Sequence, residues 1–402
     1  MSSRQVEGKT IDVAAQIVAD SYEVIPSLLA EVGLEESLIE LPSGLAVERD
    51  GKLRTVSLTA PHSLVTGGLI RLTELPVFSA LTAIPELFHS MQVQSARDVT
   101  EWAAFDDSSA EAWSRDKFGD SLTDRLLEPF LAALYFKELD QVSKATFLSV
   151  GASAFPSKKP FVIRGGIGSL CHKLGERVAH SLDCRVTGIA RRPDGSYGVS
   201  TSQGEFESDA VILAVPAPAA RGLLPETTPE ERAILSTEYM PSMTVAISTR
   251  ADWTRDSVPD SWFSLYPARE SRDLVYMAFS STLNVHAQPS DEGLLKFILS
   301  GPRIREIWNA SPESILERLA TETAGYLPGL RDAGRVVATL RFEHGMPDPG
   351  EGRFRKIRDY RAGAESRASK VLLAGDYTSH ITTDGAAESG AWAAHQLLGH
   401  ST

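Results

Sequence analysis

The sequence predicts a mixed α/β fold in which a buried sheet is assembled from segments that lie far apart in the chain. One observation is the stretch "VLLAGDYTSHITTDGAAESGAWAAHQLL", Val371 to Leu398, which reads as a short apolar strand, a Gly-Asp pair, a loop and a helix of small residues. A second is the run Ala210 to Val215, whose apolar residues do not alternate with polar ones. Such strands are typically covered on both faces. A third is region 60–150, which we expect to form a mostly helical cap.

Helices and a hairpin are expected in the first third of the chain. Helical spacing begins at Tyr22 and ends at Gly33, a plausible C-cap. Two strand-like runs flank Asp50-Gly51, a strong signal for a hairpin turn. The segment from Glu101 to Phe136 has helical character.

The rest of the chain alternates between strand and helix patterns. A glycine turn at 165–168 precedes a helix with leucines four residues apart. Further elements are expected as strands up to Ala190, at Tyr197 to Thr201, between Tyr239 and Leu299 and at Val336 to Phe342, and as a helix from Ser311 to Tyr326. The segment "EHGMPDPGEGR" after Phe342 is expected to be a loop.

These elements divide the 402 residues into two interwoven units. One discontinuous α/β unit is expected to comprise residues 1–35, 160–225 and 365–402. A second unit, with a mixed sheet and the helical cap, is expected to comprise residues 36–159 and 226–364. The chain is long enough for two or three sizeable cores.

Composition excludes several classes of function. The formal net charge of −13 argues against a nucleic-acid partner, which requires clustered Lys and Arg. The two cysteines, Cys171 and Cys184, have no metal or disulfide spacing, so a reducing cytoplasm is expected. Metal hydrolases and P-loop enzymes are excluded because their ligand clusters and phosphate loop do not occur.

The apolar stretch from Ser63 to Met91 leaves three interpretations open. Charged residues and prolines interrupt it, so none of its uninterrupted apolar runs is long enough to span a membrane. It could supply core helices, line an apolar tunnel for a bulky substrate, or dip into a membrane surface as a peripheral contact.

The stretch after Val371 has the features of a ligand site. Gly375 allows close backbone approach, and Asp376 lies at the carboxyl end of the strand, where α/β sheets usually bind ligands. Asp384 is expected to cap a helix that begins at Gly385. Ala386 and Ala387 keep the first turn of that helix uncovered, which suits an electron-rich group.

Four stretches in order resemble the flavin-containing amine oxidase superfamily, especially its protoporphyrinogen oxidase-like and phytoene desaturase-like branch. They are "GKTIDVAAQIV", "GGIGSLCHKLGERV", "CRVTGIARRPDG" with "SDAVILAVPAPAA", and "LLAGDYTSHITTDGAAESGAWAA". The resemblance implies a Rossmann-like domain that binds FAD, interwoven with a substrate domain. The cofactor-binding residues that it implies are Gln16, Val186, Ala214, Pro216, Gly375, Asp376, Gly385, Ala386 and Ala387.

Each implied residue has an expected place. Asp376 would contact the ribityl and phosphate part of FAD, and the helix start at Gly385 would face the N1–C2=O edge of the flavin. Val186 would meet the adenine through its backbone, and Gln16 would face the flavin. Ala214 and Pro216 would lie at a strand end beside the cofactor. We also expect Asp376 and the Gly385 helix start to line one cavity with Val186.

The chain departs from the family pattern at its beginning. The family's first strand, its G-x-G-x-x-G turn and the "GGR" that follows are not found, so the Rossmann-like domain is expected to be incomplete at its N-terminal end. Val13 stands where the family has Gly. A truncation, a separate partner chain that supplies this half, and a scaffold that no longer needs FAD are all compatible with the sequence. The chain alone is expected to hold FAD weakly.

The resemblance implies an FAD-dependent oxidoreductase that takes a hydride from a bulky, largely apolar small molecule. The alternative is a flavin-free member that acts as an isomerase or cyclase, or as a subunit that needs a partner chain. Because the flavin supplies the chemistry, no catalytic acid or base is assigned. His62, His344 and His380 are candidates only by residue type.

Overall fold

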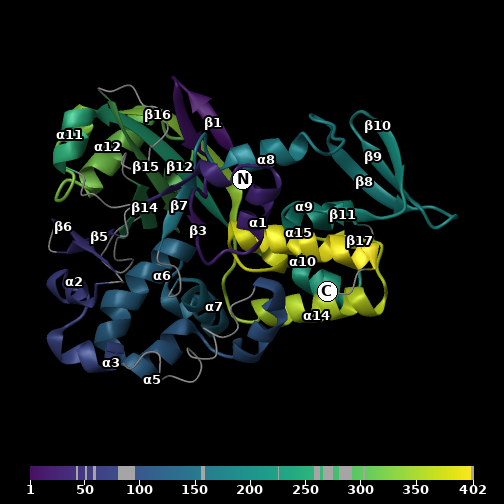
Figure 1. Ribbon diagram of the computed structural model, residues 1–402, viewed down its shortest axis with the longest axis horizontal. Helices are drawn as coiled ribbons and strands as arrows, with labels where there is room; N and C mark the ends of the chain where they lie inside the picture. The colour runs from purple at the N-terminus through teal and green to yellow at the C-terminus, as the bar shows by residue number, and fades with distance from the viewer. Residues whose placement is uncertain are drawn as a thin grey trace.

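A computed structural model describes most of the chain, and Figure 1 shows its arrangement. The described residues are 1–41, 44–49, 52–57, 60–79, 96–154, 159–224, 226–257, 263–265, 275–279, 292–301 and 304–399. The fold is mixed α/β, as predicted, and its strands belong to several separate sheets. No helix in these ranges is both long and apolar enough to cross a membrane.

The largest sheet has seven strands in the order β16-β12-β15-β14-β13-β5-β6. Its strands are β5 (Leu45–Arg49), β6 (Lys52–Val56), β12 (Tyr239–Arg250), β13 (Phe263–Leu265), β14 (Val275–Phe279), β15 (Glu292–Ser300) and β16 (Gly334–Pro347). The predicted hairpin is confirmed, because β5 and β6 pair in antiparallel fashion. Strand β16 runs five residues past Phe342, so part of the predicted loop is strand instead. The cause is β12, whose long partner edge offers pairing as far as Pro347.

A parallel pair of strands joins the distant segments that the sequence predicted to meet. Strand β11 (Val211–Leu213) pairs in parallel with β17 (Val371–Leu373). The expectation that both faces of this region are covered is wrong in part, because Ile212 is 37% exposed and Val215 is 36% exposed. The sheet of β11 and β17 has only these two strands among the described residues, and nearby helices cover only part of it (Figure 1).

Three small sheets complete the strand structure. The first has the order β10-β9-β8 and contains β8 (Val186–Arg191), β9 (Tyr197–Thr201) and β10 (Gly204–Ser208). The second has the order β3-β7-β4 and contains β3 (Val18–Ala19), β4 (Leu38–Glu40) and β7 (Pro160–Ile163). The third is the hairpin of β1 (Ser3–Val6) and β2 (Lys9–Asp12).

The described residues also form helices. They are α1 (Val24–Glu31), α2 (Pro61–Thr66), α3 (Leu75–Ser79), α5 (Ala110–Leu122), α6 (Glu128–Tyr135), α7 (Lys144–Ala154), α8 (Gly168–Gly175), α9 (Ala217–Leu223), α10 (Pro229–Leu235), α11 (Ala251–Ser257), α12 (Pro312–Glu322), α13 (Leu330–Ala333), α14 (Arg353–Ser366) and α15 (Thr383–Leu398), with 3-10 helices that include η4 (Ala96–Phe105) and η9 (Asp376–Thr378). The described part of region 60–150 is mostly helical, as predicted. Residues 80–91 of the apolar stretch from Ser63 to Met91 lie outside the described residues.

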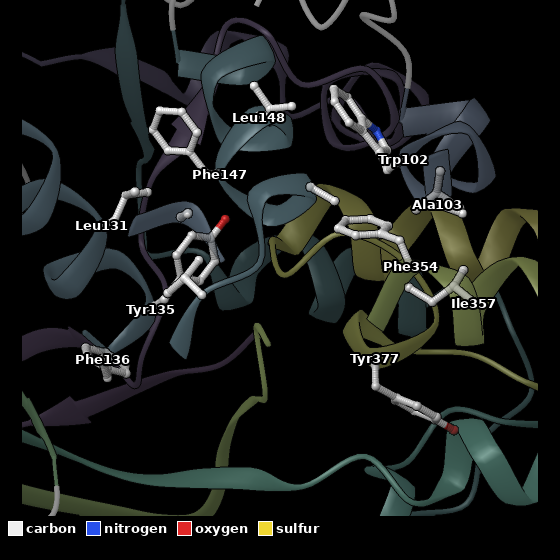
Figure 2. Close-up of a cluster of buried hydrophobic side chains, with 14 of the residues drawn as sticks. Trp102, Ala103, Leu131, Tyr135, Phe136, Phe147, Leu148, Phe354, Ile357 and Tyr377 are labelled. Atoms are coloured by element: carbon white, nitrogen blue, oxygen red, sulfur yellow. The ribbon is translucent and has the colours of Figure 1, made fainter. Parts of the chain in front are cut away.

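The main hydrophobic core lies where the helices of region 96–154 meet α14 and η9. Figure 2 shows the indole of Trp102 beside the ring of Phe354, with Tyr377 lying further along the same cluster. The centroids of the Trp102 and Phe354 rings are 6.5 Å apart. A second core, mostly of Leu, Ile and Val, lies between the seven-stranded sheet and α12.

Asp384 has a different role from the one predicted. Helix α15 begins at Thr383, and its N-cap is Thr382, whose hydroxyl accepts from the Gly385 amide at 2.9 Å. The Asp384 carboxylate instead accepts from the amides of Glu23 (3.1 Å), Val24 (3.0 Å) and Ile25 (2.7 Å) at the start of α1. It therefore caps a helix about 360 residues earlier in the chain.

We predict that Asp384→Ala lowers the free energy of unfolding by about 2–4 kcal/mol, because three amides at the start of α1, one buried and two partly buried, lose their acceptor. Asp384→Asn, which keeps one acceptor oxygen, should lose less. The control is Asp359→Ala, since Asp359 is an exposed residue of α14 and should change stability by less than about 0.5 kcal/mol. Denaturant unfolding measures all three variants, and equal midpoints for the Asp384 and Asp359 alanine variants would contradict this role.

Candidate functional site

The loop between β17 and α15 turns sharply at Gly375, directly before Asp376. Gly375 has φ +144°, and a Cβ there would lie 3.0 Å from the Tyr377 ring, so the position requires glycine. Its amide donates to the Ser389 hydroxyl of α15 at 2.7 Å. Asp376 is therefore held at the carboxyl end of a parallel strand, where the sequence placed it.

Asp376 is half-buried beside a cation. Burial raises the pKa of its carboxyl group, and the nearby Arg353 guanidinium lowers it. The same carboxylate raises the pKa of the Tyr239 hydroxyl, where burial has the largest effect. Asp376 thus lies close to both Arg353 and Tyr239, at the junction of α14, β12 and the loop.

Two arginines of α14 hold the carbonyl groups of this loop. Arg353 donates through Nη2 to the carbonyl oxygens of Asp376 and Ser379. Arg361, two helical turns further on, donates through Nη2 to the carbonyl of Thr378 at 3.1 Å. Both side chains are almost fully buried, with 5% and 3% exposed. Neither residue was predicted to belong to the site, although their spacing of eight places them on one face of a helix.

Glu388 of α15 completes the contacts around the loop. It forms a bidentate ion pair with Arg361, with N–O distances of 2.8 and 2.6 Å, and accepts from the Ser379 hydroxyl at 2.6 Å. The Arg361 guanidinium carbon also lies 4.8 Å from the Trp392 ring centroid. The loop from Gly375 to Ser379 is therefore fixed by polar contacts from two helices.

The start of α15 is less open than the sequence suggested. The Gly385 amide is capped by Thr382, and the Ala386 amide donates to the Thr382 carbonyl at 3.0 Å. A Cβ at Gly385 would lie 2.3 Å from the His380 carbonyl oxygen, so chain packing by itself requires this glycine. Ala387 packs against the core beneath α1. Cofactor contact at these three positions stays a prediction.

The segment Asp12 to Gln16 carries an unsatisfied donor. Gln16 is 8% exposed, and its Nε2 has no hydrogen-bond partner among the described residues. An unsatisfied buried amide destabilises the protein unless a ligand or water accepts from it. A flavin, whose ring edge carries carbonyl oxygens, fits this donor.

Lys296 of β15 binds the backbone of the same segment, Asp12 to Gln16. Its ammonium donates to the carbonyls of Asp12 at 3.2 Å and Ala14 at 3.1 Å. Burial lowers the pKa of Lys296 to about 8, and Asp12 opposes this effect. No local pattern marks this residue in the sequence, because its partners are backbone atoms almost 300 residues away.

The glycine turn at 165–168 is not a free phosphate loop. The Ile167 amide donates to Asp12 Oδ1 at 2.9 Å, and the Gly168 amide donates to the Ser3 hydroxyl at 2.8 Å. A Cβ at Gly166 would lie 2.4 Å from the Ser3 hydroxyl oxygen. These glycines therefore allow the first hairpin to pack against the turn.

The remaining predicted residues lie on the β8 and β11 side of the loop. Ala214 and Pro216 are exposed directly after β11, and Pro216 is the N-cap of α9. The adjoining Ala217 amide donates to the Tyr239 hydroxyl at 3.2 Å, which links this strand end to the surroundings of Asp376. Val186 is half-buried at the start of β8 and packs against the main core.

The three histidine candidates do not form a group around Asp376. Burial, together with Arg353 and Arg361, lowers the pKa of His380 to about 3, so this ring is neutral at physiological pH. His344 packs on Tyr239 with ring centroids 5.4 Å apart, and His62 is exposed on α2. The described residues contain no group of three or more side chains arranged to hold a metal.

We predict a rise in stability with pH that depends on Lys296. Its folded pKa of about 8 is below the ordinary value of 10.5, so between these pH values the unfolded chain binds more protons than the folded one. The free energy of unfolding should therefore increase by about 3 kcal/mol as the pH rises across this window. Below pH 8 Lys296 is charged in the folded and the unfolded state, so the protein should keep its lower stability there.

The matched variant is Lys296→Met, which keeps the length of the side chain without its charge. Unfolding curves at intervals from pH 7 to 10.5 should show the rise in the wild-type protein and lack it in the variant. Parallel pH profiles for the two proteins would show that Lys296 titrates normally.

Comparisons with known proteins identify the family. The family model described as "Flavin containing amine oxidoreductase" matches residues 1–398. Human protoporphyrinogen oxidase is 24% identical over 248 residues, which are 59% of this chain and 51% of that protein, and the bovine protein matches to the same extent. The chain thus spans about half the length of the curated relatives it matches.

Solved structures share the fold at low identity. A putrescine oxidase bound to putrescine has a TM-score of 0.73 at 16% identity, with 99% of this chain and 90% of that chain covered. A fatty acid isomerase from P. acnes has a TM-score of 0.66 at 16% identity, with coverage of 96% and 86%. Because the family model matches almost all residues of this chain, the chain belongs to the flavin containing amine oxidoreductase family.

Proposed function

We propose that this chain is an FAD-dependent oxidoreductase that removes a hydride from a bulky, largely apolar small molecule. The observation that carries the proposal is the half-buried Asp376 at the end of β17, in a loop fixed by Arg353, Arg361 and Glu388. Such a rigid carboxylate at a strand end suits the hydroxyl groups of a cofactor chain. The family membership supports the same cofactor.

The residues of this chain would position the cofactor. A bound flavin supplies the hydride acceptor, so the protein contributes binding, orientation and electrostatics. Asp376 would accept from the ribityl chain, and Gln16 Nε2 would donate to the flavin ring. The positive end of the α15 dipole would favour the reduced, more negative ring.

Proton transfer by a nearby side chain is not required. The His380 ring is neutral at physiological pH, and Lys296 donates to backbone carbonyls. Both side chains therefore have structural roles around the site, which agrees with chemistry supplied by the flavin.

The substrate class rests on the helical region and on the relatives. The described helices α5, α6 and α7 contribute aromatic residues to the apolar core that they share with α14 and η9. One relative is named for protoporphyrinogen, another for putrescine and another as a fatty acid isomerase. A peripheral membrane contact is also proposed, because Leu72 and Val77 are 71% and 41% exposed beside α3.

A partner chain that supplies the other half of the FAD site is a second proposal. The observation that favours it is the parallel pair β11 and β17, which leaves Ile212 and Val215 exposed. Parallel sheets are normally covered on both faces. Further strands and helices placed against this pair, from a separate polypeptide, would cover these side chains.

The fold also accommodates the alternative of a non-redox isomerase or cyclase, since one structural neighbour is a fatty acid isomerase. The visible spectrum separates this alternative from the main proposal. A protein that carries out the proposed reaction binds a flavin that its substrate bleaches without oxygen. A flavin-free isomerase shows neither the absorption bands nor the bleaching.

We predict that Asp376→Ala weakens FAD binding by about 10-fold or more, because a charge-assisted hydrogen bond is lost. The titration follows the quenching of FAD fluorescence at equilibrium, which also detects weak binding. Asp359→Ala, on the exposed face of α14, is the control and should bind as the wild-type protein does. Equal FAD affinities for the wild-type protein and both variants would show that Asp376 does not bind the cofactor. If none of the three proteins gave a flavin signal, the proposed function would be contradicted.

A further inference from the structure

Arg353 is a buried cation with unused hydrogen-bond donors. It is the first residue of α14 and is 5% exposed. A guanidinium carries five N–H groups, and the two on Nη2 serve the carbonyls of Asp376 and Ser379. The Nε and Nη1 groups have no acceptor in the described part of the structure. Three N–H groups of a buried charge are thus available.

Two carboxylates, of Asp376 and Asp106, lie near this charge. Burial lowers the pKa of Arg353 to about 10, so the group stays protonated at neutral pH. Asp376 and Asp106 act on it through their electric fields, but among the described residues neither forms an ion pair with it. The Asp106 carboxylate accepts instead from the amides of Gly352 and Phe354. An unpaired buried cation gains more from an added acceptor than a neutral group does.

The surroundings of Arg353 are aromatic. Its guanidinium carbon lies 5.1 Å from the Phe354 ring centroid. The Phe354, Trp102 and His380 rings contact one another, with centroid distances of 6.5, 6.1 and 5.7 Å. The Trp102 Nε1 is also buried, and no described residue accepts from it. Unused donors beside a set of rings match a ligand with acceptor oxygens at one end and an apolar body.

We propose that Arg353 binds the carboxylate of a hydrophobic ligand, whose apolar part lies against the rings of Trp102, Phe354 and His380. This rests on the proposed function in one respect, because the carboxylate would belong to the substrate. A phosphate offers the same oxygen chemistry. Asp376 and Asp106 favour the single charge of a carboxylate, since they repel a dianion more strongly.

Ligand entry involves a local rearrangement. The Nε and Nη1 atoms are sealed from solvent, so the carboxylate reaches them only when neighbouring side chains shift. The His380 ring is neutral and half-buried, and its displacement carries no charge through the core.

The test compares decanoate with decanamide, its neutral counterpart, by calorimetric titration of the full chain with and without added FAD. The wild-type protein should bind decanoate at least about 10-fold more tightly, because the charged acceptor forms the stronger hydrogen bonds. Decanoate should also raise the melting temperature more than decanamide does, which tests the proposal without any variant. Equal binding of the two compounds, or binding of neither, would overturn the proposal.

Variants of α14 locate the effect. Arg353→Gln should abolish the preference for decanoate, and Arg353→Lys should retain part of it, since the charge remains. Arg358→Gln, on the exposed side of the same helix, should behave as the wild-type protein does. An unchanged preference in Arg353→Gln would contradict the assignment to this residue.

Inorganic phosphate and ADP distinguish the two sources of oxygen ligands. They should not displace decanoate at equal concentration, and displacement by either would assign the site to phosphate. Because these titrations do not require turnover, a preference for decanoate without any flavin signal would contradict the oxidoreductase proposal and leave the carboxylate site standing.

Discussion

The buried polar contacts that hold the loop from Gly375 to Ser379 are the interaction on which the candidate site depends. Two arginines of α14 bind its carbonyl groups, and Glu388 and Ser389 of α15 bind a hydroxyl and an amide of the same loop. Removal of either partner from a buried pair leaves an uncompensated charge, which destabilises a protein strongly. The helices and the loop therefore keep one relative arrangement.

This arrangement links segments from the whole length of the chain. Asp384, at the start of α15, caps α1, while Lys296 of β15 holds the segment that precedes Gln16. The carboxylate of Asp376 and the unsatisfied amide of Gln16 are thus each attached to well-packed structure. Both groups are therefore preorganised for the cofactor contacts that we propose for them.

Sequence reasoning succeeded where the signal was local and failed where it was not. The hairpin at Leu45 to Val56 and the strand at Val371 follow from nearby residues, so both were predictable. Asp384 satisfies every local criterion for an N-cap, but its acceptor oxygens serve α1 instead. The buried positions of Arg353 and Arg361 were not predictable, because charged residues two turns apart are more commonly found on a solvated helix face.

Amide hydrogen exchange of the Gly375–Ser379 loop tests the central claim most directly. In the wild-type protein this loop should exchange as slowly as the core strand β12, and Arg361→Gln should accelerate its exchange while β12 stays protected. Arg358→Gln, on the exposed side of α14, should leave the loop protected. Slow exchange of the loop in Arg361→Gln would show that the polar contacts do not fix it, and that Asp376 owes its position to other parts of the fold.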